Sequence, residues 1–136
     1  DQPVLRWADP LAAEVDRLWD RRVGGTLRHA TGEWWLAGNV GLFADDRPHT
    51  HCGNLVPDFF EADPHYRPWC DDAAVNREGG VVLWNASRNG AVPPGLFARF
   101  PRAQVVEPLS IPWQTGAEID PVEIGVALVP GETLQR

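Results

Sequence analysis

The chain contains no lysine and no methionine, and its basic residues are few. All 12 of them are arginines, and 19 acidic residues give a formal net charge of -7. Nucleic-acid-binding domains and proteins that dock on anionic lipid normally present basic faces, so this balance disfavours both functions. No apolar run approaches the ~20 residues that cross a bilayer. No starting methionine or signal peptide is found, so we expect the 136 residues to be one domain that is a processed or excised piece of a longer product.

Cysteine is also scarce, with one at Cys52 and one at Cys70. They are not spaced as C-x-x-C, so a thioredoxin motif and a zinc knuckle are both excluded. An even count in a domain without a starting methionine permits an extracytoplasmic location and a disulfide between them. We predict this disulfide, which would stabilise the fold by roughly 3 kcal/mol. Two separate buried thiols are the alternative.

The patterns that are present alternate between helix and strand. Apolar residues at helical spacing predict a first helix over 9–23, and the run at 81–84 predicts a buried strand. The other expected elements are strands at 26–30, 49–53, 104–111 and 122–129, helices at 33–43, 73–78 and 93–100, an irregular segment at 54–70, and loops at 85–90 and 112–121. This order predicts a three-layer α/β fold with a mostly parallel sheet of about five strands, an antiparallel edge and helices on both faces. The expected core includes Leu18, Leu27, Val82, Leu83, Val105, Val106, Ile124 and Val126.

Open α/β sheets bind ligands beyond the carboxyl ends of their strands. The residues predicted at that edge are Thr31, Gly32, Glu33, Asn85, Ser87, Arg88 and Asn89. Arg88 near a helix N-terminus could hold a phosphate or a carboxylate, and a solvated polar loop is the alternative. Because neither G-x-G-x-x-G nor a P-loop is present, we expect no nucleotide and no cofactor.

Histidines suggest one metal hypothesis. His49 and His51 would face the same side of a strand and could ligate zinc or copper, with His65 and Cys70 completing the set. The alternative, which we favour, is ordinary edge-strand histidines beside a disulfide that uses the cysteine sulfurs.

Catalytic patterns are not evident. The pairs Asp45-Asp46 and Asp71-Asp72 stand at turn and helix-start positions, where aspartate is favoured as a cap. Neither a Ser-His-Asp arrangement nor paired acid–base carboxylates can be recognised, so a small hydrolase is disfavoured.

Aromatic residues suggest a binding surface, since seven tryptophans are many for this length. Rings presented together can form a platform for sugars or enter a lipid interface, although core packing is the alternative. The predicted ligand-binding residues are Glu33, Trp34, Trp35, Asp63, Tyr66 and Trp69, with Trp113 as a further aromatic candidate.

Three stretches carry a family resemblance. Residues 32–48 read GEWWLAGNVGLFADDRP and are similar to G-x-x-W-x-A-G-N-x-x-F/Y-x-x-D-R-P. Residues 63–72 read DPHYRPWCDD and are similar to D-P-x-x-S-P-W-x-D-D. The third stretch combines 80–84, 100–103 and 108–113. Together they resemble the extracytoplasmic C-terminal domain of bacterial membrane glycosyltransferases of the family 39 type, related to protein mannosyltransferases and aminoarabinose transferases.

The resemblance implies a parent enzyme that uses a polyprenyl-phosphate sugar donor, with its catalytic acid on an early loop outside this chain. The domain itself would be a non-catalytic accessory at the periplasmic face of the inner membrane. Its partners would be the membrane-embedded part of the same polypeptide and a glycan or lipid-linked sugar. Cys52 and Cys70 depart from the family pattern. An independent periplasmic binding or metal-handling protein is the alternative.

Overall fold

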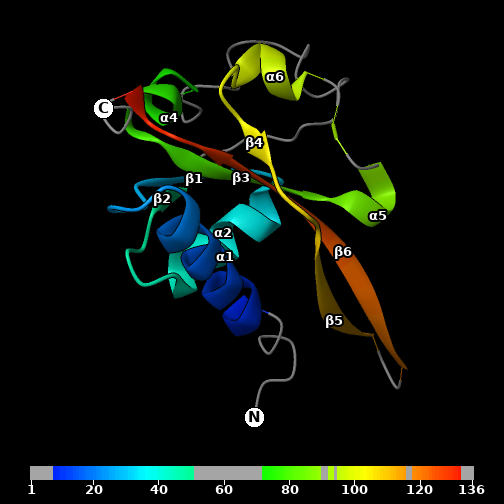
Figure 1. Ribbon diagram of the computed structural model, residues 1–136. Coiled ribbons are helices and arrows are strands. Elements are labelled where there is room, and N and C mark those ends of the chain that lie inside the picture. The colour runs from blue at the N-terminus through cyan, green and yellow to red at the C-terminus, as the bar shows by residue number, and fades with distance from the viewer. Residues whose placement is uncertain (1–7, 51–71, 90–91, 94, 116–117, 133–136) are drawn as a thin grey trace.

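The computed structural model describes residues 8–50, 72–89, 92–93, 95–115 and 118–132. These residues form an α/β fold built on one six-stranded mixed sheet (Figure 1). In chain order the elements are α1 (Ala8–Arg22), β1 (His29–Gly32), α2 (Trp34–Phe43), β2 (His49–Thr50), α4 (Asp72–Glu78), β3 (Gly80–Asn85), α5 (Ala86–Asn89), α6 (Leu96–Arg99), β4 (Gln104–Val105), β5 (Leu109–Thr115) and β6 (Glu118–Val129). The predicted α/β class is therefore confirmed.

The sheet is parallel only in part, which corrects the expected layout. Its strands follow the order β2-β1-β3-β6-β4, and β5 also pairs with β6. Only β2, β1 and β3 run parallel to one another, and every pairing of β6 is antiparallel. The physical reason is the length of β6, whose 12 residues serve three antiparallel partners.

The expected loop at 112–121 is wrong for the same reason. Pro112 and Pro121 suggested that the chain breaks there, but they lie opposite each other in the β5–β6 ladder. The single strand expected at 104–111 is instead divided into β4 and β5. The polar loop expected at 85–90 contains the short helix α5. Proline and polarity signals thus misplaced these boundaries.

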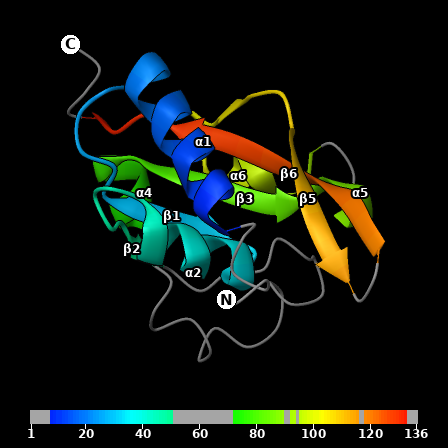
Figure 2. The same ribbon diagram turned by 90° about the horizontal axis from the view of Figure 1, so that it is seen from below.

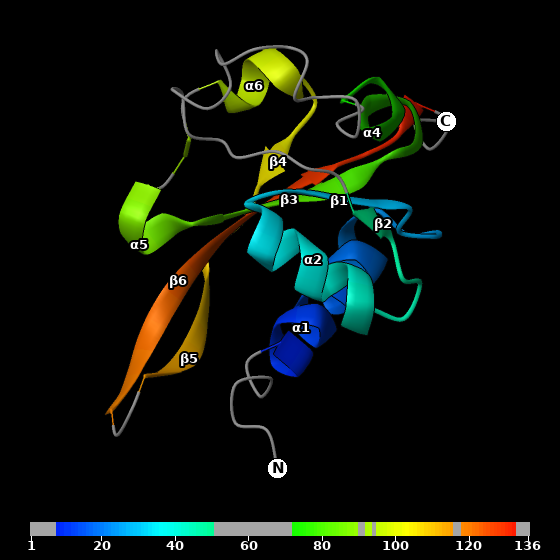
Figure 3. The same ribbon diagram turned by 180° about the vertical axis from the view of Figure 1, so that it is seen from behind.

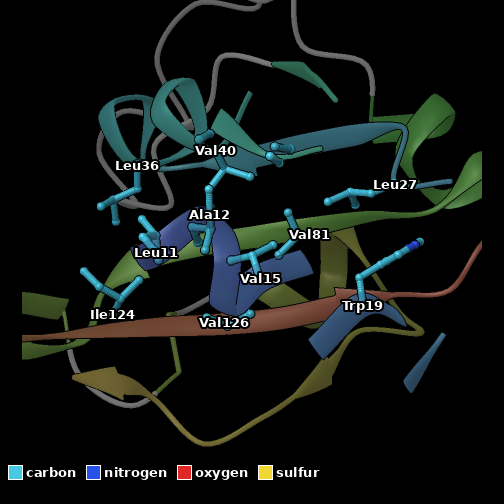
Figure 4. Packing of buried hydrophobic residues seen from close by; sticks show 14 of the residues in the cluster. Leu11, Ala12, Val15, Trp19, Leu27, Leu36, Val40, Val81, Ile124 and Val126 are labelled. Carbon is cyan, nitrogen blue, oxygen red and sulfur yellow. The ribbon is translucent and has the colours of Figure 1, made fainter. Parts of the chain in front are cut away.

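Helices cover both faces of the sheet, as predicted. Alternation along the strands places Ala30, Val81 and Val126 in the cluster that faces α1 and α2. Figure 4 shows Val81 and Val126 among side chains of the two helices. The other face carries Val82 and Ala127 and packs against α4 and α6. Figures 2 and 3 show the two helix layers on opposite sides of the strands.

The first helix has the apolar face that its sequence predicts. Leu11, Val15 and Trp19 recur every four residues and are completely or almost completely buried. The indole N–H of Trp19 donates to the carbonyl oxygen of Gly25 at 3.0 Å. This bond holds the chain against the helix as it turns toward β1.

Most of the predicted core is buried. Leu27, Val82, Leu83, Val106, Ile124 and Val126 are all buried, and Leu18 is partly buried against them. The prediction that Val105 is buried is wrong, since 39% of this residue is exposed. Val105 belongs to the two-residue strand β4, which is the last strand in the sheet order and has a neighbouring strand on one side only.

Trp84 and Gly125 form a close pair across β3 and β6. The two residues are directly opposite in the ladder. A Cβ added to Gly125 would lie 2.0 Å from Cε2 of Trp84. Glycine therefore leaves the space in which the indole lies across the neighbouring strand, and Trp84 is buried as a result.

Candidate functional site

The parallel strands β1 and β3 end at the same edge of the sheet. From this edge the chain continues into α2 after β1 and toward α5 and α6 after β3. Figure 3 shows α2 and α6 on opposite sides of the sheet. Adjacent parallel strands whose connections leave toward opposite faces create the place where open α/β sheets bind ligands.

The two strands remain joined to the very end of this edge. Gly32 has φ of 110°, and a Cβ there would lie 2.1 Å from the carbonyl oxygen of Leu83. The next residue, Glu33, donates its backbone N–H to the same oxygen at 2.8 Å. The backbones of β1 and β3 therefore stay in contact where the strands end, and no gap separates them. We call this polar edge of the sheet the ledge.

The polar side chains predicted at this edge have different surroundings. Glu33 and Asn85 are half-buried. Ser87 is exposed, and its Oγ accepts the backbone N–H of Glu123 at 3.1 Å, so it ties α5 to β6. Arg88 and Asn89 lie in the four-residue helix α5, where a polar loop was predicted.

Thr31 points away from this ledge. It is 1% exposed and shares its side of β1 with His29, which faces α4. Among the described residues, its hydroxyl has no hydrogen-bond partner. Thr31 is thus a buried residue of the α4 face and does not line the ledge.

The structure places only part of the predicted aromatic platform. Glu33 directly precedes α2, and Trp34 and Trp35 are the first two residues of that helix. Trp113 lies in β5. The remaining predicted site residues fall outside the described residues, namely His51, Cys52, Asp63, His65, Tyr66, Trp69 and Cys70. The disulfide and the platform therefore stay predictions.

A histidine–carboxylate pair is present that the sequence analysis missed. His29 in β1 is 8% exposed, and its Nε2 lies 2.6 Å from Oε1 of Glu78 at the end of α4. The hydrogen bond from His29 is the main reason that the pKa of Glu78 falls below its usual range. Nothing in the sequence connects these residues, because they meet only when β1 and α4 pack together.

His49 lies next to this pair. It is the parallel register partner of His29, and the two rings meet edge to face with centroids 6.3 Å apart. A carboxylate fixes the orientation of an imidazole, which can then hold or pass on a proton. Within the described residues, no group of three or more His, Cys, Asp or Glu side chains could hold a metal ion.

The acidic pairs act over longer distances than the capping interpretation implied. Asp46 accepts the backbone N–H of Leu27 at 2.9 Å. Asp72, the first residue of α4, binds the guanidinium of Arg99 through both carboxylate oxygens, each at 2.7 Å. These two carboxylates hold distant segments together, while Asp71 lies outside the described residues.

Comparison with known proteins identified no relative. The chain matches no protein-family model, no curated protein and no solved structure. In the described part of the chain, none of the helices combines the length and the apolar character that crossing a bilayer requires. Arguments about function therefore depend on the residues themselves.

Proposed function

We propose that this chain is a non-catalytic, extracytoplasmic accessory domain of a bacterial membrane glycosyltransferase of the family 39 type. The membrane-embedded part of the same polypeptide would use a polyprenyl-phosphate sugar donor and carry the catalytic acid. The accessory domain would lie at the periplasmic face of the inner membrane and help to recognise an acceptor glycan or the lipid-linked sugar.

One observation carries the proposal. The longest resembling stretch, residues 32–48, coincides with a continuous unit that runs from the end of β1 through α2 to the start of β2. Several of the residues that match the family pattern shape this unit. Gly32 allows the close approach to Leu83, Asp46 holds Leu27, and Pro48 is buried before β2. The similarity is thus one of a folding unit, which supports a relationship between domains and leaves catalysis to the parent chain.

Glu33 is the predicted ligand-binding residue whose side-chain environment is described. It is half-buried at the ledge beside the start of α2, where a carboxylate can accept hydrogen bonds from sugar hydroxyls. Trp34 and Trp35 follow it directly in the chain, so rings and a carboxylate arise from adjacent positions. This arrangement favours a saccharide over an anionic ligand.

The coding sequence upstream of Asp1 provides the first test. We expect it to encode many apolar segments of ~20 residues each. A signal peptide alone would overturn the proposal and favour the independent periplasmic binding protein.

The second test uses the full-length enzyme in membrane vesicles with a polyprenyl-phosphate sugar. Deleting the domain is expected to lower sugar transfer, and the isolated domain is expected to transfer none. Glu33→Gln should raise the acceptor KM with little change in kcat, since it removes binding made equally in ground and transition states. Glu107→Gln, an exposed carboxylate between β4 and β5, is the matched control. Unchanged transfer after deletion would contradict an accessory role.

A further inference from the structure

The β5–β6 hairpin extends beyond the rest of the sheet (Figures 1 and 3). The last residue of β3, Asn85, pairs with Ile124, whereas β6 begins at Glu118. Among the described strands, only β5 pairs with residues 118–123 of β6, and only β6 pairs with β5. Within that part of the chain, the hairpin is therefore a two-stranded ribbon that is open at both edges. Open edges of this kind can add a strand from another chain.

Two hydrogen bonds fix which backbone groups of β6 point toward its outer edge. Val106 donates its N–H to the carbonyl oxygen of Val126 at 3.0 Å, so the backbone groups of Val126 point toward β4 and β5. Glu123 donates its N–H to Oγ of Ser87, which follows β3, so the backbone groups of Glu123 point the opposite way. These directions alternate along a strand. The even-numbered residues of β6 therefore face β5, and the odd-numbered residues of 119–123 face the open edge.

Each open edge of the ribbon has a proline at its centre. On β6 the outward positions alternate through 119–123, and the middle one is Pro121. Its register partner is Pro112, which is the middle one of the outward positions in 110–114 of β5. Because a proline nitrogen carries no hydrogen, neither residue can donate to an added strand. The ladder between β5 and β6 needs no donor at these two positions, so the hairpin itself loses no hydrogen bond.

The β5 edge lacks further protections that the β6 edge has. Exposed edges are commonly protected by charged side chains as well as by proline. Residues 118–123 of β6 read EIDPVE and include three acidic residues, and Ser87 already takes the N–H of Glu123 at 3.1 Å. The β5 strand reads LSIPWQT and contains no charged residue. Of these protections, β5 has the proline alone.

We propose that Pro112 keeps the outer edge of β5 from pairing with the same edge of a second copy of this chain. Two copies related by a two-fold axis at this position would align their β5 strands antiparallel, each donating to the other. The two ribbons would then form one four-stranded sheet, which is more stable than a hairpin of two strands. Proline removes the central donor from both copies. The inference uses only described residues and does not depend on the function proposed above.

The test compares three variants of the whole 136-residue chain by analytical ultracentrifugation over a range of concentrations. Pro112→Thr restores the central donor with a residue that favours strands, and should form a dimer at least about tenfold tighter than any self-association of the parent chain. Pro121→Thr makes the same change on the β6 edge, and Pro101→Thr makes it in an exposed turn before β4. Each of these two should change self-association by less than about twofold, because the first edge keeps its other protections and the second position is not on the ribbon.

Returning a proline to the same edge provides a matched reversal. Gln114 is the next outward position on β5, so Pro112→Thr/Gln114→Pro again removes a donor from this edge and should restore the monomer. Pro112→Ala, checked by far-UV circular dichroism, restores the same donor and replaces the threonine variant if that variant unfolds. A folded Pro112 variant that stays monomeric would overturn the proposal. Equal dimerisation of all three threonine variants, or of the parent chain, would overturn it as well.

Discussion

The two glycines of α2, Gly38 and Gly41, have opposite surroundings, with open space at the first and close contacts at the second. Gly38 is a helix-interior glycine with open space where a Cβ would be, so Gly38→Ala should stabilise the fold by about 0.5–1 kcal/mol through helix propensity. Gly41→Ala would place its Cβ 2.2 Å from Oγ1 of Thr50 and 3.2 Å from the carbonyl oxygen of Pro48, and should cost about 1–3 kcal/mol. Urea unfolding of both variants measures the two effects. Equal effects would show that α2 and β2 do not pack as described.

Asp16 predicts a pH dependence at the same scale. Burial is the main cause that raises its pKa, followed among the raising influences by Asp45, Asp46 and Asp20. The folded state therefore holds this proton more tightly than the unfolded state, and the contribution of Asp16 to stability falls as pH rises through its pKa. Asp16→Asn keeps an oxygen for the Asp45 N–H and removes the charge. It should stabilise the protein at neutral pH by about 0.5 kcal/mol.

Thermal unfolding across pH checks this prediction. The advantage of Asp16→Asn should shrink as pH falls and disappear below about pH 3, where the wild-type carboxyl is protonated in both states. Glu107→Gln provides a matched exposed carboxylate. An Asp16→Asn advantage that persists unchanged at low pH would mean that the effect does not arise from charge.

At the scale of elements, α4 and α6 are held together by one polar cluster. Asp72 binds Nε and Nη2 of Arg99, and Nδ2 of Asn76 donates to the carbonyl oxygens of Asp72 at 3.0 Å and Arg99 at 2.9 Å. Both helices are short, with 7 and 4 residues, so neither has much intrinsic stability. The cluster supplies the tertiary contacts that such short helices require.

Replacing Arg99, whose guanidinium donates to both carboxylate oxygens of Asp72, tests this role. Arg99→Lys retains the charge and loses the paired geometry, so we expect a loss of about 1–2 kcal/mol. Asp72→Ala leaves a largely buried guanidinium without its carboxylate and should cost about 2–3 kcal/mol. The control is Glu14→Gln, which breaks the exposed Glu14–Arg17 pair on α1 and should cost less than about 0.5 kcal/mol in the same urea unfolding assay. Equal losses of stability in all three variants would mean that the cluster does not specifically stabilise the packing of α4 against α6.

Elements with strong local signals were predictable, and those that depend on partners were not. Local sequence signals placed α1, α2 and β3 within one or two residues. The antiparallel pairing of the last two strands was predicted, but the extension of the β5–β6 hairpin into 112–121 was missed, because its prolines look like strand breakers until the two strands pair. At the candidate site, the residues after β1 and β3 followed from the α/β pattern. The His29–Glu78 pair did not, since contacts between distant residues leave no periodic signal.

At the scale of the whole molecule, excess negative charge opposes compactness. The chain carries 19 acidic against 12 basic residues, and the carboxylates at the end of α2 repel one another without a salt bridge among the described residues. Folding concentrates these charges, and dissolved salt at ~0.1 M screens the repulsion between exposed charges that lie more than about 10 Å apart. The protein should therefore be more stable at higher ionic strength.

We expect sodium chloride at about 0.5 M to raise Tm at neutral pH by about 2–5 °C relative to low salt, because screening relieves the folded state more than the expanded chain. The same comparison near the sequence pI of about 4.9 is the control, since net charge is then close to zero and any rise in Tm reflects general salting-out. The difference between the two pH values isolates the charge effect. Asp20→Asn/Asp45→Asn should reduce it, because the charges of these two side chains repel that of Asp16. A Tm that falls with salt at neutral pH would show that attractive ion pairs outweigh repulsion, contrary to the charge distribution described.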